Sequence, residues 1–362
     1  MARVHNYFAG PAALPLEALK AAQEELLDFR GTGMSVMEIS HRSKEFDELH
    51  NETISLFKEL SGLGDNFKVL LLQGGASLQF AMVPMNFLSE GKSADYILTG
   101  AWSKKAIKEA KILGNTRVAG TTEKDGIFSS IPKQEDLDLD NNAVYCHVTS
   151  NNTIFGTQWR SFPDTGSVPL VGDMSSDILS RRFDTSRFGV IYAGAQKNLG
   201  PSGVTIVAIR EDMMEKANEG LLTLLNYKTH IDKNSLFNTP PCFAIYMVNL
   251  SLKWVKERGG LDAMEKENNE KAKLIYGTID GNKDFFRCPI EPESRSFMNV
   301  VFRLPNEDLE KKFIEDGKNA GFIGLKGHRS VGGIRVSIYN ANTLDSVKDV
   351  VEFMKNFATS NG

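Results

Sequence analysis

An aspartate and a lysine close two apolar runs of the sequence. Asp173 ends the run Val168–Asp173, and Lys197 ends the run Val190–Lys197. Such runs, bounded by turn residues, predict buried parallel strands that bring both charges to the carboxyl edge of one sheet. A lysine amine condenses with an aldehyde, and a buried carboxylate keeps a pyridine nitrogen protonated. The pair is therefore typical of a pyridoxal phosphate site, with an ordinary ion pair or a solvated rim as the alternative.

A glycine turn follows an earlier apolar run. Gln73–Ser77 reads Gln-Gly-Gly-Ala-Ser and separates the strand-like Val69–Leu72 from the helix-like Leu78–Leu88. Glycines permit a tight turn, and the free N–H groups at a helix start bind phosphate. No Gly-Lys-Ser/Thr closes the turn, so it is not a Walker loop. We expect a phosphate-binding turn, with a purely structural turn as the alternative.

Two further side chains are expected at the same sheet edge. Trp102 begins a helical segment after Thr99-Gly100-Ala101, and its ring would stack on a pyridine ring. Thr153 follows the strand-like Val144–Val148 and offers a hydroxyl to a cofactor. The alternatives are that Trp102 is an ordinary core residue and that Thr153 belongs to a Ser/Asn-rich loop without a binding role.

Basic residues form a second group. His41-Arg42 lies in a predicted loop, and His328-Arg329 precedes Arg335, which lies inside the strand-like Ile334–Ile338. Arginine binds carboxylates and phosphates through paired hydrogen bonds, so this group predicts a doubly anionic substrate. The alternative is that these residues are solvated surface charges. This alternative fits Arg335 least well, because an unpaired charge within a strand is costly.

Composition narrows the class of protein. The chain has 362 residues, 41% hydrophobic and 24% charged, with a formal net charge of −4. This argues for a globular fold with small-molecule ligands and against nucleic acid. The absence of a secretory core near the start and of a membrane-span pattern predicts a cytoplasmic protein. Three separated cysteines without metal-ligand spacing predict no zinc site and no disulfide framework.

The elements that would position these residues alternate along the chain. Strand-like and helix-like segments follow one another from Phe67 to Ile209, which predicts an α/β fold with a mostly parallel sheet covered by helices. An earlier helix is expected with Leu16, Leu19, Leu26 and Leu27 on one side. We expect an N-terminal segment over 1–15, a large domain over 16–260 and a small α+β domain over 261–362.

Taken together, the motifs resemble the phosphoserine aminotransferases, a family within class V of the fold type I pyridoxal phosphate enzymes. The resemblance runs through nearly the whole chain. Its motifs are Asn6–Ala12, His41–Ser43, Gly74–Ala76, Gly100–Ser103, Asp173–Ser176, Gly194–Asn198, Asn238–Pro241 and Gly327–Arg329. It implies a seven-stranded-type sheet and amino transfer from L-glutamate to 3-phosphohydroxypyruvate. With a broader substrate range, such an enzyme would also accept the phosphorylated four-carbon keto acid of vitamin B6 synthesis.

The resemblance also implies roles for residues. Lys197 would bind the cofactor aldehyde and shuttle a proton, and Asp173 would hold the ring nitrogen protonated. Other cofactor contacts would come from Ala76, Ser77, Trp102, Thr153 and Gln196, and from Asn238 and Thr239 of a neighbouring subunit, which implies a homodimer. Arg335 would bind the substrate α-carboxylate, with His41, Arg42, His328 and Arg329 around the distal anion. Some family members have an arginine where Ser77 stands, so one cation is absent here.

Two other functions are weighed against this one. A desulfurase of the same superfamily needs a mobile nucleophilic cysteine. Neither Cys146, in a strand-like run, nor Cys242, after two prolines, lies in a flexible loop. A non-catalytic descendant would keep the fold but lose Lys197 or Asp173, and both are present.

Overall fold

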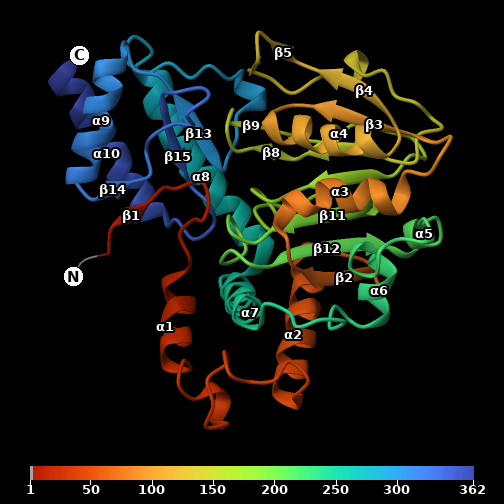
Figure 1. The fold of residues 1–362 in the computed structure, drawn as a ribbon. Coiled ribbons are helices and arrows are strands. Elements are labelled where there is room, and N and C mark those ends of the chain that lie inside the picture. The colour runs from red at the N-terminus through yellow and green to blue at the C-terminus, as the bar shows by residue number, and fades with distance from the viewer. Residues whose placement is uncertain (1–2) are drawn as a thin grey trace.

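The computed structural model describes residues 3–362, and its centre is a seven-stranded sheet (Figure 1). The strands lie in the order β2-β12-β11-β10-β7-β3-β4. β12 runs antiparallel to both neighbours, while all other neighbouring pairs are parallel. The strands are β2 (Phe67–Leu72), β3 (Ser93–Leu98), β4 (Asn115–Thr121), β7 (Cys146–Thr149), β10 (Leu170–Asp173), β11 (Phe188–Gly194) and β12 (Thr205–Arg210). The predicted α/β fold with a mostly parallel sheet is confirmed.

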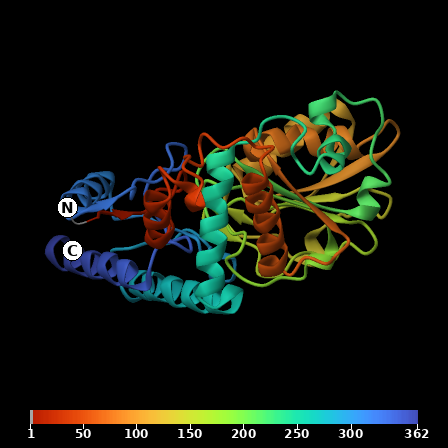
Figure 2. The same cartoon turned by 90° about the horizontal axis from the view of Figure 1, so that it is seen from below.

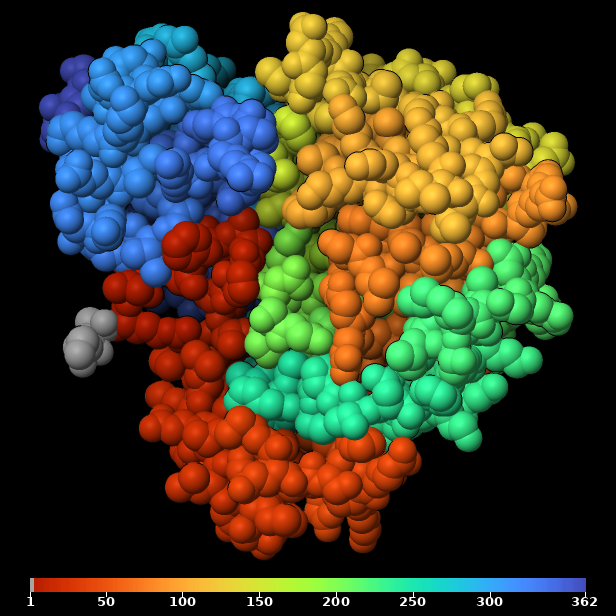
Figure 3. Space-filling model, viewed as in Figure 1, coloured from red at the N-terminus to blue at the C-terminus, as the bar shows by residue number. Residues whose placement is uncertain are grey.

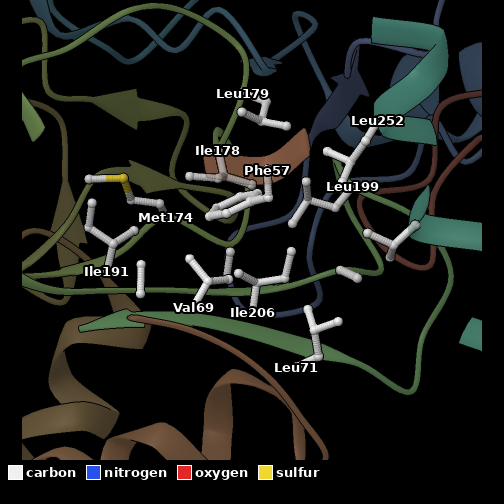
Figure 4. Packing of buried hydrophobic residues seen from close by; sticks show 14 of the residues in the cluster. Phe57, Val69, Leu71, Met174, Ile178, Leu179, Ile191, Leu199, Ile206 and Leu252 are labelled. Atoms are coloured by element: carbon white, nitrogen blue, oxygen red, sulfur yellow. The ribbon is translucent and has the colours of Figure 1, made fainter. Parts of the chain in front are cut away.

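Helices cover both faces of the sheet because its apolar side chains alternate between them. Val69 and Leu71 belong to the core beneath α2 (Lys44–Ser61) and α7 (Cys242–Glu257). Figure 4 shows part of this core, in which Phe57 of α2 lies beside Ile178 and above Val69 and Ile206 of the sheet. Leu70 and Leu72 face the opposite core, under α3 (Gly75–Phe87) and α4 (Ala101–Leu113). Figure 2 shows α2 and α7 side by side.

A third core lies in the C-terminal part of the chain. The long helix α8 (Gly260–Gly281) packs along α10 (Leu344–Asn361), as Figure 2 shows. Both flank a short antiparallel pair, β13 (Asn299–Phe302) with β15 (Ile334–Ser337), and α9 (Glu307–Asn319) completes this region. The predicted domain limits, 1–15, 16–260 and 261–362, stay a prediction.

Local capping explains several helix boundaries. Ser43, Asn306 and Thr343 accept hydrogen bonds from backbone N–H groups at the starts of α2, α9 and α10, which satisfies donors that the helix leaves free. Gly62, in a left-handed conformation, ends α2. The remaining short elements are β1 (His5–Asn6), β5 (Glu123–Lys124), β6 (Ile127–Phe128), β8 (Asn151–Asn152), β9 (Thr157–Gln158), β14 (Phe322–Ile323), α5 (Glu211–Met214), α6 (Tyr227–Asp232) and the 3₁₀ turns Phe29–Gly31, Gln134–Asp136, Thr185–Arg187, Thr223–Leu225 and Pro292–Ser294.

Two expectations need correction. The first helix, α1 (Leu16–Glu24), ends before Leu26 and buries Ala18 and Ala22, whereas Leu27 is 84% exposed. The small alanines pack because α1 lies close against α7. The second apolar run does not carry its strand to Lys197, because β11 ends at Gly194 and a turn follows. Among the described helices, none is long and apolar enough to cross a membrane.

Candidate active site

Lys197 lies in the turn after β11, beside the ends of β7 and β10. Its Nζ donates a hydrogen bond to Thr153 Oγ1 at 2.8 Å. Burial lowers the pKa of Lys197 to about 8, an effect that the Asp173 carboxylate opposes and the Arg335 charge reinforces. A substantial share of this amine is therefore neutral near physiological pH, which is the form that reacts as a nucleophile.

Asp173 ends β10 and is 5% exposed. Ser175 donates to Asp173 Oδ1 from its backbone N at 3.1 Å and from its Oγ at 2.6 Å. Burial raises the pKa of Asp173, while Lys197 and the Ser175 hydrogen bonds lower it. The Ser175 hydroxyl also accepts from Gly194 N at 3.1 Å. Ser175 thus ties Asp173 to the strand that leads to Lys197, a role that its place two residues after an aspartate signals.

Trp102, in the first turn of α4, lies next to Lys197. Lys197 Nζ is 5.4 Å from the centroid of the Trp102 ring. Lys105 Nζ is 4.3 Å from the same centroid. The indole Nε1 is buried without a hydrogen-bond partner among residues 3–362. The ring is thus placed, as predicted, at the edge of the sheet beside the reactive amine.

The glycine turn opens α3 as the sequence predicts. Gly74 caps the helix with φ 91°, and a Cβ at this position would lie 2.4 Å from Leu78 Cδ2. No side chain caps the helix, so the N–H groups near Ala76 and Ser77 stay available to an anion. The turn is one wall of a cavity of about 240 Å³ whose lining includes Gln73, Leu78 and Asn238. The carbonyl of Thr239 accepts from Gln73 Nε2 at 2.8 Å.

Arg335 reaches the same site from β15. Its Nη1 donates to the carbonyl of Thr153 at 3.3 Å, and its Nε is buried without a partner in the described chain. Burial lowers the pKa of Arg335. Lys197 and Arg335 therefore both donate hydrogen bonds to Thr153, and the guanidinium of Arg335 keeps donors that can bind a carboxylate.

Arg329 adds a positive charge next to His328, and the two residues lie in the loop before β15. Burial lowers the pKa of His328, as do the charges of Arg335, Arg329 and Lys105. The His328 Nδ1 lies 2.7 Å from Ser330 Oγ. Ser330 and Val331, which follow Arg329 in the chain, line a cavity of about 800 Å³ together with Ala101, Phe155 and Ile334. Figure 3 shows a depression between the orange and blue parts of the chain, with green atoms at its floor.

Not every predicted site residue gathers here. Gln196 does, since its side-chain amide packs on Gly194 and its carbonyl accepts from Ala12 N at 3.0 Å. The segment with His41 and Arg42, between α1 and α2, extends away from the carboxyl edge of the sheet (Figure 1). Within one chain it makes no side-chain hydrogen bond or ion pair to the groups above, among residues 3–362.

The cysteines carry no activated thiol. Cys146 is buried, and burial raises the pKa of Cys146, Cys242 and Cys288. A raised pKa disfavours the thiolate that a desulfurase uses as its nucleophile. The described residues also hold no group of three or more side chains suited to a metal ion.

Known proteins match this chain in sequence and in fold. The aminotransferase class-V family matches residues 4–350. The phosphoserine aminotransferase of Lysinibacillus sphaericus is 57% identical over 98% of both chains. The solved phosphoserine aminotransferase of Bacillus circulans subsp. alkalophilus has 54% identity, covers 99% of both chains and gives a TM-score of 0.97. The PLP-bound enzyme of Trichomonas vaginalis has 40% identity and a TM-score of 0.93, over 98% of this chain and 100% of its own.

The fold, the partly buried Lys197 with the buried Asp173, and the family match define a class V aminotransferase. With relatives at 52–57% identity over nearly its full length, the chain belongs to the phosphoserine aminotransferases.

Proposed function

We propose that this chain transfers the amino group of L-glutamate to 3-phosphohydroxypyruvate, reversibly, with pyridoxal phosphate as cofactor. The products are 2-oxoglutarate and O-phospho-L-serine. The observation that carries the proposal is the meeting of a reactive amine and a carboxylate-binding guanidinium on Thr153. The same pocket adds further cations for a second anionic group, and both substrates carry two anionic ends.

The residues present fit pyridoxal phosphate. Asp173 is nearly fully buried, and its hydrogen bonds from the described chain go to Oδ1, which leaves Oδ2 for a protonated ring nitrogen. Trp102 offers a ring face beside Lys197, and Thr153 and Gln196 lie at the same edge. Ala76 and Ser77 start a helix with free N–H groups for the phosphate. Pyridoxal phosphate supplies an electron sink that stabilises negative charge at the substrate α-carbon.

Lys197 has two tasks in this proposal. Its amine would hold the cofactor aldehyde in the resting enzyme, and would move a proton to and from the substrate α-carbon once substrate binds. A pKa of about 8 suits both tasks, because a group titrating near the working pH gives and takes protons readily. Thr153 orients the amine through its hydroxyl, which accepts from Nζ.

Arg335 would bind the α-carboxylate shared by all four substrates. His328 and Arg329 would then face the distal group, which is a carboxylate in glutamate and a phosphate in phosphoserine. A positively charged group of side chains can bind either the carboxylate or the phosphate, because arginine forms paired hydrogen bonds with both kinds of anion. The phosphorylated four-carbon keto acid differs by one carbon, and we include it as a second acceptor of the same cluster.

A homodimer would complete the site. Among residues 3–362, no side-chain hydrogen bond joins His41, Arg42, Asn238 or Thr239 to Lys197, and their proposed roles therefore call for a second copy. Exposed apolar side chains on the same part of the chain as His41 support such contact, including Leu27 and Met37, which are 84% and 59% exposed. Three free cysteines support a reducing compartment, and we place the protein in the cytoplasm.

Steady-state kinetics tests the function. Glutamate and 3-phosphohydroxypyruvate, varied together, should give parallel double-reciprocal lines, because the amino group leaves the first substrate before the second binds. Lys197→Ala should abolish turnover. Intersecting lines, or turnover with alanine in place of glutamate at an equal rate, would contradict the proposal.

A further inference from the structure

We propose that Lys105 is a further substrate-binding residue of this site and binds the distal phosphate of the three-carbon substrate. This inference rests on the proposed function and adds a specificity determinant to it. Lys105 belongs to α4, whose residues Ala101 and Lys104 line the same cavity as Ser330 and as Ile334 of β15.

The geometry places Lys105 beside the reactive centre. It lies three residues after Trp102, one helical turn along α4, so both side chains share one face of the helix. Lys105 Nζ is 4.3 Å from the Trp102 ring centroid, and Lys197 Nζ is 5.4 Å from it. The two ammonium groups thus flank one aromatic ring, although they come from different elements of the sheet edge.

The charge of Lys105 also acts on His328. Its charge is one of three, with those of Arg335 and Arg329, that lower the pKa of His328. Charges influence a titrating group in this way only at short range or through protein of low dielectric constant. Lys105 and the His328–Arg329 pair therefore face a common space.

These cations lack carboxylate partners. No ion pair in the described chain includes Lys105, Arg329 or Arg335. The neighbouring Lys104, by contrast, is neutralised by Glu123 at 2.6 Å. Unpaired charges of one sign around a cavity raise the local concentration of an oppositely charged ligand. The arrangement therefore suits an anion that enters from solvent.

The charge of that anion points to the phosphate. Ser77, at the start of α3, is uncharged, so the glycine turn adds no cation of its own to the cavity. A phosphate carries nearly two negative charges near pH 7, whereas the distal carboxylate of glutamate carries one. An added ammonium group stabilises the phosphate more than the carboxylate, and Lys105 thereby biases the shared pocket toward the phosphorylated substrate.

Equilibrium binding to the holoenzyme tests this without turnover. The two probes are 3-phosphoglycerate and 2-hydroxyglutarate, which keep both anionic groups but carry a hydroxyl in place of the amino group. Lys105→Ala should weaken the binding of 3-phosphoglycerate by about 10-fold and that of 2-hydroxyglutarate by less than about 3-fold, a difference of at least about 0.7 kcal/mol. Lys105→Arg should restore most of the affinity. Lys108→Ala, an exposed lysine one turn further along α4, is the matched control and should change neither.

A second measurement separates binding from folding. Histidine NMR should find the pKa of His328 higher in Lys105→Ala than in the wild type, since one nearby positive charge is gone. Equal losses for the two probes, or no loss for either, would overturn the role of Lys105 while leaving the proposed function intact. A wild-type enzyme that converts neither glutamate nor phosphoserine would instead overturn the proposed function.

Discussion

Lys197 and Thr153 are joined by a 2.8 Å hydrogen bond from Nζ to Oγ1, while the carbonyl of the same threonine accepts from Arg335. Thr153 follows β7 and β8 in a loop that the sheet positions, and it is 4% exposed. Thr153 therefore holds the amine of Lys197 and the guanidinium of Arg335 close together, although the two residues are far apart in the sequence.

Replacing Thr153 with valine should lower kcat about 10-fold with either amino donor. The valine keeps the shape but removes the acceptor that orients Nζ, which is worth about 1 kcal/mol or more at a charged donor. Single-turnover kinetics measures the effect. Thr205→Val is the control, because the Thr205 hydroxyl is buried without a partner in the described chain. An unchanged rate in Thr153→Val would reject the orienting role.

Arg335→Ala should raise the KM of both glutamate and 3-phosphohydroxypyruvate by about 10- to 100-fold, since a charge-assisted hydrogen bond to a carboxylate contributes about 1.5–3 kcal/mol. His328→Ala should act unequally on the two, because it faces only the distal group. Initial-rate measurements over both substrates decide this. If Arg335→Ala leaves both KM values at the wild-type level, the α-carboxylate lies elsewhere.

Much of this architecture was predictable from the sequence. Glycine turns and apolar runs give strong local signals, so the alternation of strands and helices, the start of α3 after Gly74 and the edge position of Asp173 are confirmed. Arg335 within a strand is also confirmed. The exposure of Leu27 was missed because helical spacing in the sequence does not reveal where α1 ends.

Contacts between distant segments were harder to predict. Lys105 has no motif of its own, and only folding brings it to Trp102 and toward His328. Ser175 has a local signal next to Asp173, yet its bond to Gly194 N depends on the pairing of β10 with β11. The family resemblance grouped His41 and Arg42 with the other cations, and this stays a prediction, because within one chain they lie on the separate segment between α1 and α2.

Lys271 provides a prediction on stability. It is fully buried in α8, and its Nζ donates to the carbonyls of Ile338, Tyr339 and Asn342 at 3.3, 2.9 and 2.9 Å. Burial lowers its pKa to about 7, with Glu267 opposing and Arg258 reinforcing the shift. Between about pH 7 and about pH 10 the unfolded chain therefore binds a proton that the folded protein does not, so Lys271 contributes stability that grows as pH rises.

Lys271→Met should accordingly destabilise the protein more at pH 9 than at pH 7, by at least about 1 kcal/mol in the free energy of unfolding. Urea titrations at the two pH values measure the difference. Lys273→Met, an exposed neighbour on the same helix, should give the same small effect at both. A Lys271→Met effect that falls as pH rises would contradict the assignment.

Gly74→Ala should weaken cofactor binding by about 10-fold or more. The left-handed backbone and the 2.4 Å approach to Leu78 Cδ2 leave no room for a methyl group, so the turn and its N–H groups must shift. Equilibrium dialysis of the apoprotein with pyridoxal phosphate measures this. Gly277→Ala, in the interior of α8 with open space around its Cβ position, should instead stabilise the fold by about 0.5–1 kcal/mol with unchanged cofactor affinity.

The most direct test of the central claim is an absorption titration of the purified protein loaded with pyridoxal phosphate. L-Glutamate and O-phospho-L-serine are added separately, each without a keto acid. Either amino acid should remove the visible cofactor band, 3-phosphohydroxypyruvate should restore it, and Lys197→Ala should lack the wild-type band. A band that responds to neither amino acid would contradict a shared transaminase site built on Lys197 and Arg335.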